Sequence, residues 1–177
     1  MSIYFVRHGQ TDWNLHGRLQ GQSDIFLNDT GIVQARDAKQ QLNNIKIDRI
    51  ICSPLARAKQ TASILNENWN IIIHEDERLM ERSFGKLEGS YHTTWKDVAL
   101  WVYDSEDEHL FQMEPIKSFF QRVYACLKDV QDIHPEENIL IVAHGGVSIP
   151  FACYFDHTLE KADLSQLILK NCEIAKV

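Results

Sequence analysis

Strand-like and helix-like segments alternate along most of this 177-residue chain. Short runs rich in Val and Ile are typical of buried strands, whereas apolar residues every three or four positions are typical of helices. Alternation of the two favours a mainly parallel sheet with helices on both faces. We therefore predict an α/β fold, a three-layer α/β/α sandwich, in one domain spanning residues 1–177. The predicted strands are residues 2–6, 47–53, 70–76 and 138–144 with an edge strand in 166–177, and the predicted helices are 28–42, 53–65 and one from Pro115.

Two of the predicted helices carry recognisable start signals. Ser53 is the expected N-cap of one helix, with Pro54 at its first position, where the missing N–H of proline costs nothing. Asn28 or Thr30 is the expected N-cap of the 28–42 helix. The second predicted strand therefore gives way directly to a helix at Ser53.

Composition excludes several classes of function. Eighteen basic and 25 acidic side chains leave a net charge of −7, which disfavours nucleic acid or an anionic membrane as a partner of the whole surface. The four cysteines form no C-x-x-C pair and are expected to be reduced core residues of a cytoplasmic protein. The apolar start at residues 3–6 is shorter than the roughly 7 residues of a signal segment. We expect neither export nor a membrane span, and the oligomeric state stays open.

The stretch from about residue 83 to 115 departs from this alternation. We predict that it forms a small cap-like excursion, with the acidic run DSEDE at residues 104–108 as a solvated loop. Its aromatic side chains either contact a substrate or pack into a local core, and the sequence leaves both open. These aromatic residues are Tyr91, Trp95, Trp101, Tyr103 and Phe111.

Side chains that are or can become cationic follow three of the predicted strands. Arg7 and His8 follow the first strand, Arg57 lies in the helix after the second, and His144 ends the fourth. Ligands of open α/β sheets bind beyond the carboxyl ends of the strands, so these side chains are expected at one edge. Arginine offers paired N–H donors to phosphate, and a helix N-terminus adds aligned amides. The pattern predicts a pocket for a phosphoryl group.

Other catalytic templates fit the sequence less well. The chain has no G-x-S-x-G, G-x-x-x-x-G-K-[ST] or G-x-G-x-x-G motif, which argues against acyl hydrolysis and against nucleoside triphosphate or dinucleotide binding. A metal held by His8 and His144 would be repelled by Arg7 and Arg57, and no carboxylate cluster accompanies the two histidines. We expect neither a metal nor another cofactor.

A neutral imidazole beside a bound phosphoryl group can attack phosphorus, which makes His8 the candidate nucleophile and phosphohistidine the intermediate. The leaving oxygen then needs a proton donor, and both Glu81 and Glu88 lie just past the third predicted strand. Glu81 is nearer the strand end, which makes it the better candidate for general acid and then general base. In that role its pKa is expected to be raised by burial.

Five segments resemble the histidine phosphatase superfamily, also called the phosphoglycerate mutase-like family, in order and spacing over nearly the whole chain. They are VRHGQTDWN (6–14), LQG (19–21), SPLARAKQTA (53–62), LMERSFGKLEG (79–89) and VAHGG (142–146). The resemblance implies that His8 is the phosphorylated nucleophile and Glu81 the acid and base, without a metal, on a mixed six-stranded sheet. It also implies that the substrate is bound by Arg7, Asn14, Gln20, Gly21, Arg57 and His144.

Three functions remain open, and the phosphatase branch is favoured. The first is a phosphomonoesterase acting on a small phosphate monoester, the second a phosphoglycerate mutase, and the third a non-catalytic phosphate-binding module. A binding module is disfavoured because His8 and Glu81 are both present. A mutase is disfavoured because residues 83–121 hold three lysines and seven acidic residues, a balance of −4 that would repel a doubly anionic substrate. We also expect no C-terminal tail to close over the site and keep water out. The natural substrate and its pathway stay open.

Overall fold

The computed structural model describes residues 1–161 and 163–177, and its strands form one mixed sheet in the order β3-β2-β4-β1-β5. The pairings of β1 with β4, β4 with β2 and β2 with β3 are parallel, and only β5 runs antiparallel to its neighbour β1. The predicted α/β fold with a mostly parallel sheet is therefore confirmed. The strands are β1 (Ile3–Arg7), β2 (Arg49–Cys52), β3 (Ile73–Glu75), β4 (Ile139–Ala143) and β5 (Ile174–Lys176).

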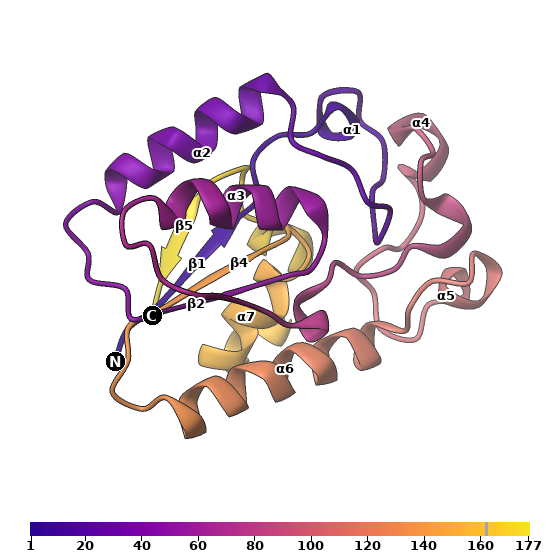
Figure 1. The fold of residues 1–177 in the computed structure, drawn as a ribbon. Coiled ribbons are helices and arrows are strands. Elements are labelled where there is room, and N and C mark those ends of the chain that lie inside the picture. Colours follow the sequence, from indigo (N-terminus) through magenta and orange to yellow (C-terminus); the bar gives the residue numbers. More distant parts are fainter. Residues whose placement is uncertain (162) are drawn as a thin grey trace.

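Helices cover both faces of this sheet. Figure 1 shows α2 and α3 on one face, α6 and α7 on the other, and the short α1, α4 and α5 together at one end. None of the helices in the described residues is long and apolar enough to span a membrane. The α-helices are α1 (Asp12–Leu15), α2 (Asp29–Gln41), α3 (Ala56–Asn66), α4 (His92–Trp95), α5 (Glu106–Leu110), α6 (Ile116–Ile133) and α7 (Ser148–Phe155), and the 3-10 turns are η1 (Glu77–Leu79), η2 (Gly85–Leu87), η3 (His157–Lys161) and η4 (Leu164–Leu167).

The central strands are buried on both faces, which explains their continuous apolar sequence. In β1, Ile3 and Phe5 pack into the core beneath α6 and α7, whereas Tyr4 and Val6 pack into the core beneath α2 and α3. The predicted apolar face of α6 is buried in the first of these cores, from Ile116 onward. Polar side chains therefore appear only where a central strand ends, and that is where Arg7 and His8 lie.

The six-stranded sheet implied by the resemblance is wrong, because the described residues contain five strands. The predicted edge strand at 166–177 is reduced to β5, since the residues before it are bound elsewhere. The Ser148 hydroxyl donates to the Leu167 carbonyl and accepts from the Leu169 amide, and Arg7 donates to the Leu169 carbonyl at 2.6 Å. Residues 167–171 therefore run beside the carboxyl end of β1 and do not extend the sheet.

The start of α3 also differs from the prediction. Asn28 is the N-cap of α2 as expected, but α3 begins at Ala56, so Ser53 is not its N-cap and Pro54 is not its first residue. The Ser53 hydroxyl lies 2.7 Å from His144 Nε2 instead, and the Ala56 amide donates to the Asp24 carboxylate at 2.6 Å. A carboxylate from a distant loop therefore caps this helix, and the serine contacts a histidine of the candidate site.

Residues 83–115, here called the cap, contain η2, α4 and α5 and have a small apolar cluster of their own. The acidic run at 104–108 is not the solvated loop that we predicted. Ser105 caps α5, and Glu108 is 6% exposed because it is bound inside the cap. The cap cluster consists of Phe84, Leu87, Leu100 and Met113, with Trp95, Trp101 and Phe111 packed against it.

A buried ion pair connects the cap to the segment after β3. Arg82 is fully buried, and its guanidinium donates to the Glu108 carboxylate at 2.7 Å and to the Glu114 carbonyl at 2.7 Å. It also donates to the Leu100 carbonyl. Glu108 Oε1 in turn accepts from the Ile116 amide at 2.8 Å. One arginine therefore holds three parts of the cap, at residues 100, 108 and 114.

Replacing Glu108 is expected to destabilise the protein strongly. Glu108→Gln leaves the buried Arg82 charge without its partner, and losing one partner of a buried ion pair costs about 3 to 5 kcal/mol. Urea unfolding followed by tryptophan fluorescence measures the loss. Asp104→Asn is the matched control, because Asp104 pairs with Lys117 on the exposed surface, where a pair contributes less than about 1 kcal/mol. Equal losses in the two variants would contradict the structural role of Glu108.

Candidate active site

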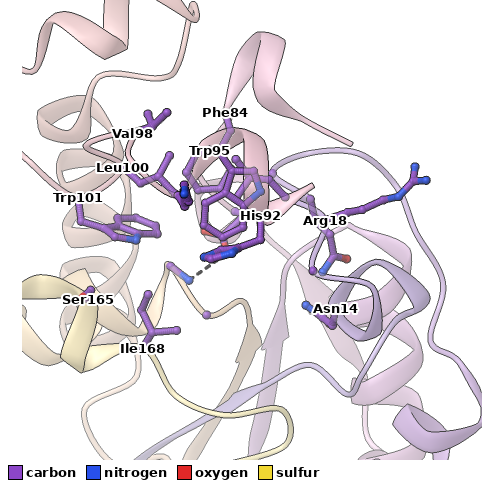
Figure 2. Close-up of a pocket in the computed structure, with 18 of the residues that line it drawn as sticks. Asn14, Arg18, Phe84, His92, Trp95, Val98, Leu100, Trp101, Ser165 and Ile168 are labelled. Carbon is purple, nitrogen blue, oxygen red and sulfur yellow. Dashed lines mark hydrogen bonds between the residues drawn. The ribbon is translucent and has the colours of Figure 1, made fainter. Parts of the chain in front are cut away.

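The predicted site residues lie at the carboxyl edge of the sheet, around a cavity of about 720 Å³. Figure 2 shows Trp101, Leu100 and Val98 of the cap along one side, and Asn14 and Arg18 on the opposite side. Ligand cavities of enzymes commonly have this size. Seven of the eight predicted residues line it, namely Arg7, His8, Asn14, Gln20, Gly21, Arg57 and Glu81.

The eighth residue, His144, lies beneath the cavity and is fully buried. Strand register explains its place, since Arg7 pairs with Ala143 across β1 and β4. The next residues, His8 and His144, are therefore neighbours, with ring centroids 5.2 Å apart. Burial, followed by the charge of Arg57, lowers the pKa of His144 well below its usual value. His144 is thus a neutral imidazole beside His8.

His8 presents one unprotonated ring nitrogen. Its Nδ1 lies 2.7 Å from the Gly9 carbonyl, which can only accept a hydrogen bond, so Nδ1 carries the proton. Nε2 keeps its lone pair, and Arg57 Nε donates to it at 3.3 Å. Burial, followed by the charges of Arg57 and Arg7, lowers the pKa of His8 well below its usual value. The ring is therefore neutral near pH 7 and able to act as a nucleophile through Nε2.

Arg57 is held rigidly by the loop that follows α1. It lies in the first turn of α3, is fully buried, and donates to the carbonyls of Ser23 and Gly21 at 2.7 Å each. Burial lowers its pKa to about 10, so the side chain stays charged at neutral pH. The remaining guanidinium nitrogen, Nε, is the one that meets His8. Arg57 thus places a fixed positive charge beside the His8 ring.

Glu88, the alternative proton donor, holds that same loop and does not line the cavity. Its carboxylate accepts from the Ser23 amide at 2.9 Å, the Ser23 hydroxyl at 2.8 Å and the Phe84 amide at 3.1 Å. Gly21 has a φ of +54°, and a β-carbon there would lie 2.2 Å from Glu88 Oε1. A glycine is therefore required where the loop passes the Glu88 carboxylate.

Glu81 is the carboxyl that reaches the cavity. Its Oε1 accepts from the Arg82 amide and its Oε2 from the Gly146 amide, both at 2.9 Å. Burial raises the pKa of Glu81, against the opposing effect of these hydrogen bonds and of Arg57 and Arg7. A buried carboxyl with a raised pKa can hold a proton near neutrality and release it to a reacting group.

Unpaired buried nitrogens are concentrated at this site. Among residues 1–161 and 163–177, two buried side-chain polar atoms lack a hydrogen-bond partner, Arg7 Nε and His144 Nδ1. An unsatisfied buried polar group costs about 1 to 3 kcal/mol, so such groups commonly mark functional positions. Arg7 lines the cavity with His8, and the His144 ring is next to that of His8, so the oxygens of a bound anionic group could satisfy both nitrogens.

The C-terminal segment is a part of the site that the sequence did not reveal. We predicted only an edge strand in residues 166–177, but Ser165 and Ile168, which precede β5, line the cavity, as Figure 2 shows. Asn171 Nδ2 donates to the His8 carbonyl at 2.9 Å and reaches Asn14 Oδ1 at 3.4 Å. These residues belong to none of the five family segments and carry no local signal of a ligand site.

The aromatic residues of the cap divide between the two roles that the sequence left open. Trp95 and Trp101 line the cavity and also pack against the cap cluster. The Arg18 guanidinium carbon lies 4.2 Å from the ring centroid of Tyr91. Tyr103 packs on Phe120 of α6, and Phe111 packs against the cap cluster. Of these five residues, only the two tryptophans line the cavity and are therefore placed to touch a bound molecule.

The acidic residues that make the cap negatively charged do not lie in the cavity wall. Residues 83–121 are all described, and none of their seven acidic side chains lines the cavity. Glu108 and Glu114 are engaged with Arg82 and Arg122, for example. The cationic or cation-capable residues Lys96, Arg18 and His92 do line the outer part of the cavity. The electrostatic argument drawn from the −4 balance of this stretch is therefore weakened.

Comparison with known proteins shows the family of the chain. The model of the histidine phosphatase superfamily (branch 1) matches residues 3–177. The uncharacterised phosphatase PhoE of Bacillus subtilis (strain 168) is 34% identical over 179 residues, covering 99% of this chain and 89% of the relative. The probable phosphoglycerate mutase GpmB of Enterobacter sp. (strain 638) is 33% identical over 184 residues, covering 100% and 84%. A mycobacterial glucosyl-3-phosphoglycerate phosphatase, solved in complex with VO3, matches with a TM-score of 0.83 at 25% identity, covering 99% of this chain and 91% of that one.

The sandwich and its cavity define an α/β protein with a cationic site at the carboxyl edge of its sheet. The family model covers nearly the whole chain, and the chain belongs to the histidine phosphatase superfamily. It is an enzyme of that superfamily with phosphatases among its relatives. The resemblance carried by the five sequence segments is thus confirmed.

Proposed function

We propose that this protein is a phosphomonoesterase that hydrolyses a small phosphate monoester through a phosphohistidine at His8. One observation carries the proposal: a neutral His8 presents Nε2 beside Arg57 in a cavity that Arg7 also lines. The two unpaired buried nitrogens of the described residues belong to Arg7 and to His144, whose ring is next to that of His8. Three cationic or hydrogen-bonding groups around one nucleophilic nitrogen match the three non-bridging oxygens of a phosphoryl group. A non-catalytic binding module would need neither the unprotonated Nε2 nor a buried Glu81.

In the first step, His8 Nε2 attacks phosphorus and the bond from phosphorus to the ester oxygen breaks. Glu81 gives its proton to the departing oxygen, and the substrate alcohol leaves. Arg7, Arg57 and His144 bind the non-bridging oxygens, and Asn14 and Gln20 complete the wall around them. The Nδ1–H bond to the Gly9 carbonyl stabilises the positive charge that the ring gains.

In the second step, the Glu81 carboxylate takes a proton from water as the water oxygen attacks phosphorus. The N–P bond breaks, and the electron pair returns to His8 Nε2. Inorganic phosphate leaves, and Glu81 is again protonated for the next cycle. The positive charge needed at phosphorus comes from Arg7 and Arg57, so this scheme uses no metal ion.

The leaving group is proposed to be apolar or ring-bearing. The part of the cavity beyond the phosphate position is formed largely by apolar side chains of the cap and the C-terminal segment. Aromatic and aliphatic walls of this kind bind rings by burying their surface. The residues are Phe84, Trp95, Val98, Leu100, Trp101, Val102 and Ile168.

A phosphoglycerate mutase is the second candidate, favoured by one specific observation. Lys96, Arg18 and His92 line the outer cavity, where a second anionic group of a substrate would lie. A mutase relative is also among the similar proteins. The reaction would use the same His8 and Glu81 but return the phosphoryl group to the bound sugar acid instead of to water.

Phosphate release is expected to exceed isomerisation. The purified protein is incubated with 3-phosphoglycerate plus catalytic 2,3-bisphosphoglycerate and, separately, with aryl and sugar monoesters, each with and without a chelator. Free phosphate and 2-phosphoglycerate are both quantified. We expect hydrolysis of the aryl esters, unchanged by the chelator, and little 2-phosphoglycerate. Efficient isomerisation with little free phosphate would replace the phosphatase by the mutase, and loss of activity with the chelator would contradict the metal-free scheme.

A further inference from the structure

We propose that Trp101 of the cap is a positioning residue that keeps water away from the Glu81 carboxyl. The inference rests on the proposed function, in which Glu81 gives a proton to the leaving oxygen. It assigns the cap a part in the chemistry in addition to its contact with the substrate. Trp101 belongs to none of the five family segments in the sequence.

The Trp101 indole and the Glu81 carboxyl both lie directly against Gly146. A β-carbon on residue 146 would lie 2.1 Å from Glu81 Oε1 and 2.6 Å from Trp101 Cη2. The two side chains therefore close around the same point, and the missing side chain of Gly146 makes room for both. Because the Gly146 amide also donates to Glu81 Oε2, the carboxyl is held between a backbone donor and an indole edge.

Several groups from different elements face Glu81, and most favour its ionised form. The positive charges of Arg57 and Arg7 lower its pKa, as do the amide hydrogen bonds from Gly146 and Arg82. Only burial raises the pKa, and burial is the largest of these effects. Whatever excludes water from this carboxyl therefore decides its protonation. The charged groups around it are Arg7 at the end of β1, Arg57 on α3, Arg82 beside it, and Arg122 on α6, which donates to the Glu81 carbonyl. The titratable His8 lines the same cavity.

The indole is fixed in place by the cap and by α6. Its ring packs edge-on against Phe84, with centroids 5.7 Å apart, and at a tilt against Phe119 of α6, with centroids 6.4 Å apart. The Arg82 guanidinium lies 5.9 Å from the indole centroid, and the same arginine binds the carbonyl of Leu100. The ion pair of Arg82 with Glu108 therefore anchors the residue directly before Trp101.

Removing the indole is expected to lower the pKa of Glu81. A carboxyl against an apolar ring loses solvation of its charged form, and water admitted in place of the ring restores that solvation. The acid form is then depleted at lower pH, so proton donation fails earlier as the pH rises. Esters with poor leaving groups depend on this proton, whereas activated aryl esters do not.

The kinetic test compares Trp101→Leu and Trp101→Phe with the wild type. kcat/KM is measured against pH for an alkyl phosphate and for p-nitrophenyl phosphate. The second ionisation of each phosphate ester affects the pH profile of every variant equally. Differences between the pH profiles of the variants therefore arise from the enzyme. For Trp101→Leu we expect the high-pH limb of the alkyl ester to move about one unit lower, and Trp101→Phe to recover part of that shift.

A second readout is independent of turnover. The carboxyl carbon of Glu81 is followed by 13C NMR in glutamate-labelled protein, and its signal is the one that disappears in Glu81→Gln. We expect it to titrate about one unit lower in Trp101→Leu than in the wild type. An unchanged Glu81 titration in Trp101→Leu overturns the inference.

Trp95→Leu is the matched control, because Trp95 is the other cavity tryptophan and lies on α4. This variant is expected to raise KM for ring-bearing esters. It is expected to leave unchanged both the high-pH limb of kcat/KM for the alkyl ester and the titration of Glu81. An equal shift in Trp95→Leu would show a general effect of opening the cavity and would overturn the role given to Trp101.

Failure of the proposed function gives a different result. If Glu81→Gln turns over the alkyl ester as fast as the wild type, Glu81 is not the proton donor, whatever its titration in Trp101→Leu. If Glu81→Gln loses that activity while Trp101→Leu keeps the wild-type limb and titration, only the inference about Trp101 fails.

Discussion

His8→Ala is expected to abolish turnover of every phosphomonoester, with a loss of at least about 10⁴-fold in kcat, because no other group can form the covalent intermediate. His8 is the only cavity-lining residue whose unprotonated ring nitrogen is aligned by a backbone carbonyl, within the described part of the chain. The folded state is expected to survive, since the substitution removes a polar ring at the end of β1 and leaves the apolar core intact. Steady-state kinetics and circular dichroism measure the two properties separately.

The intermediate itself is the sharper test of His8. Wild-type enzyme is mixed with a 32P-labelled monoester and quenched in alkali, and the labelled peptide is mapped. The label is expected on His8 and is expected to be lost in acid, as phosphohistidine is. His74→Ala is the matched control, because His74 is exposed on β3, outside the cavity, and it is expected to keep full activity. Label on another residue, or substantial activity in His8→Ala, contradicts the assignment.

Glu81→Gln is expected to slow esters with poor leaving groups by about 10² to 10⁴-fold and activated aryl esters far less. The amide side chain has nearly the same shape but no proton of suitable acidity. Any structural disturbance slows both substrates alike, so the ratio of the two losses isolates proton donation. The measurement is kcat/KM for an alkyl and an aryl phosphate in parallel.

Glu88→Gln is the control for this second experiment. Glu88 holds the loop whose carbonyls bind Arg57. Losing the Glu88 carboxylate is therefore expected to lower kcat/KM for both substrates to a similar degree. A substrate-dependent loss in Glu88→Gln larger than that in Glu81→Gln would transfer the proton-donating role to Glu88. Equal slowing of both esters in Glu81→Gln would show that Glu81 is not the proton donor.

Local signals in the sequence were sufficient for the sheet and for the location of the cavity. Apolar strands that are buried on both faces end abruptly at polar residues, and parallel strands end at one edge. The positions of Arg7, His8 and Arg57 at that edge therefore follow from short stretches of sequence alone. The apolar spacing of α6 and the N-cap of α2 at Asn28 are equally local signals, and both were predicted correctly.

Contacts between residues far apart in the chain decided the rest. Ser53 was predicted to cap a helix, but its hydroxyl meets His144, 91 residues away, and Asp24 caps that helix instead. The predicted edge strand is short because Arg7 and Ser148 bind the residues before it. Ser53 had a plausible local role as a helix cap, and its distant partner became available only when the fold closed.

By itself, the sequence determined the α/β architecture, the superfamily and the edge at which the candidate site forms, because these depend on hydrophobic periodicity and on motifs within single segments. Only the tertiary structure decided that Glu81 reaches the cavity while Glu88 binds a loop, that His144 lies beside His8, and that Trp101 and Glu81 both lie against Gly146. It also decided that the acidic residues of the cap do not line the cavity. The direction of a side chain in a loop is set by the partners that surround it, and those partners come from every layer of the fold.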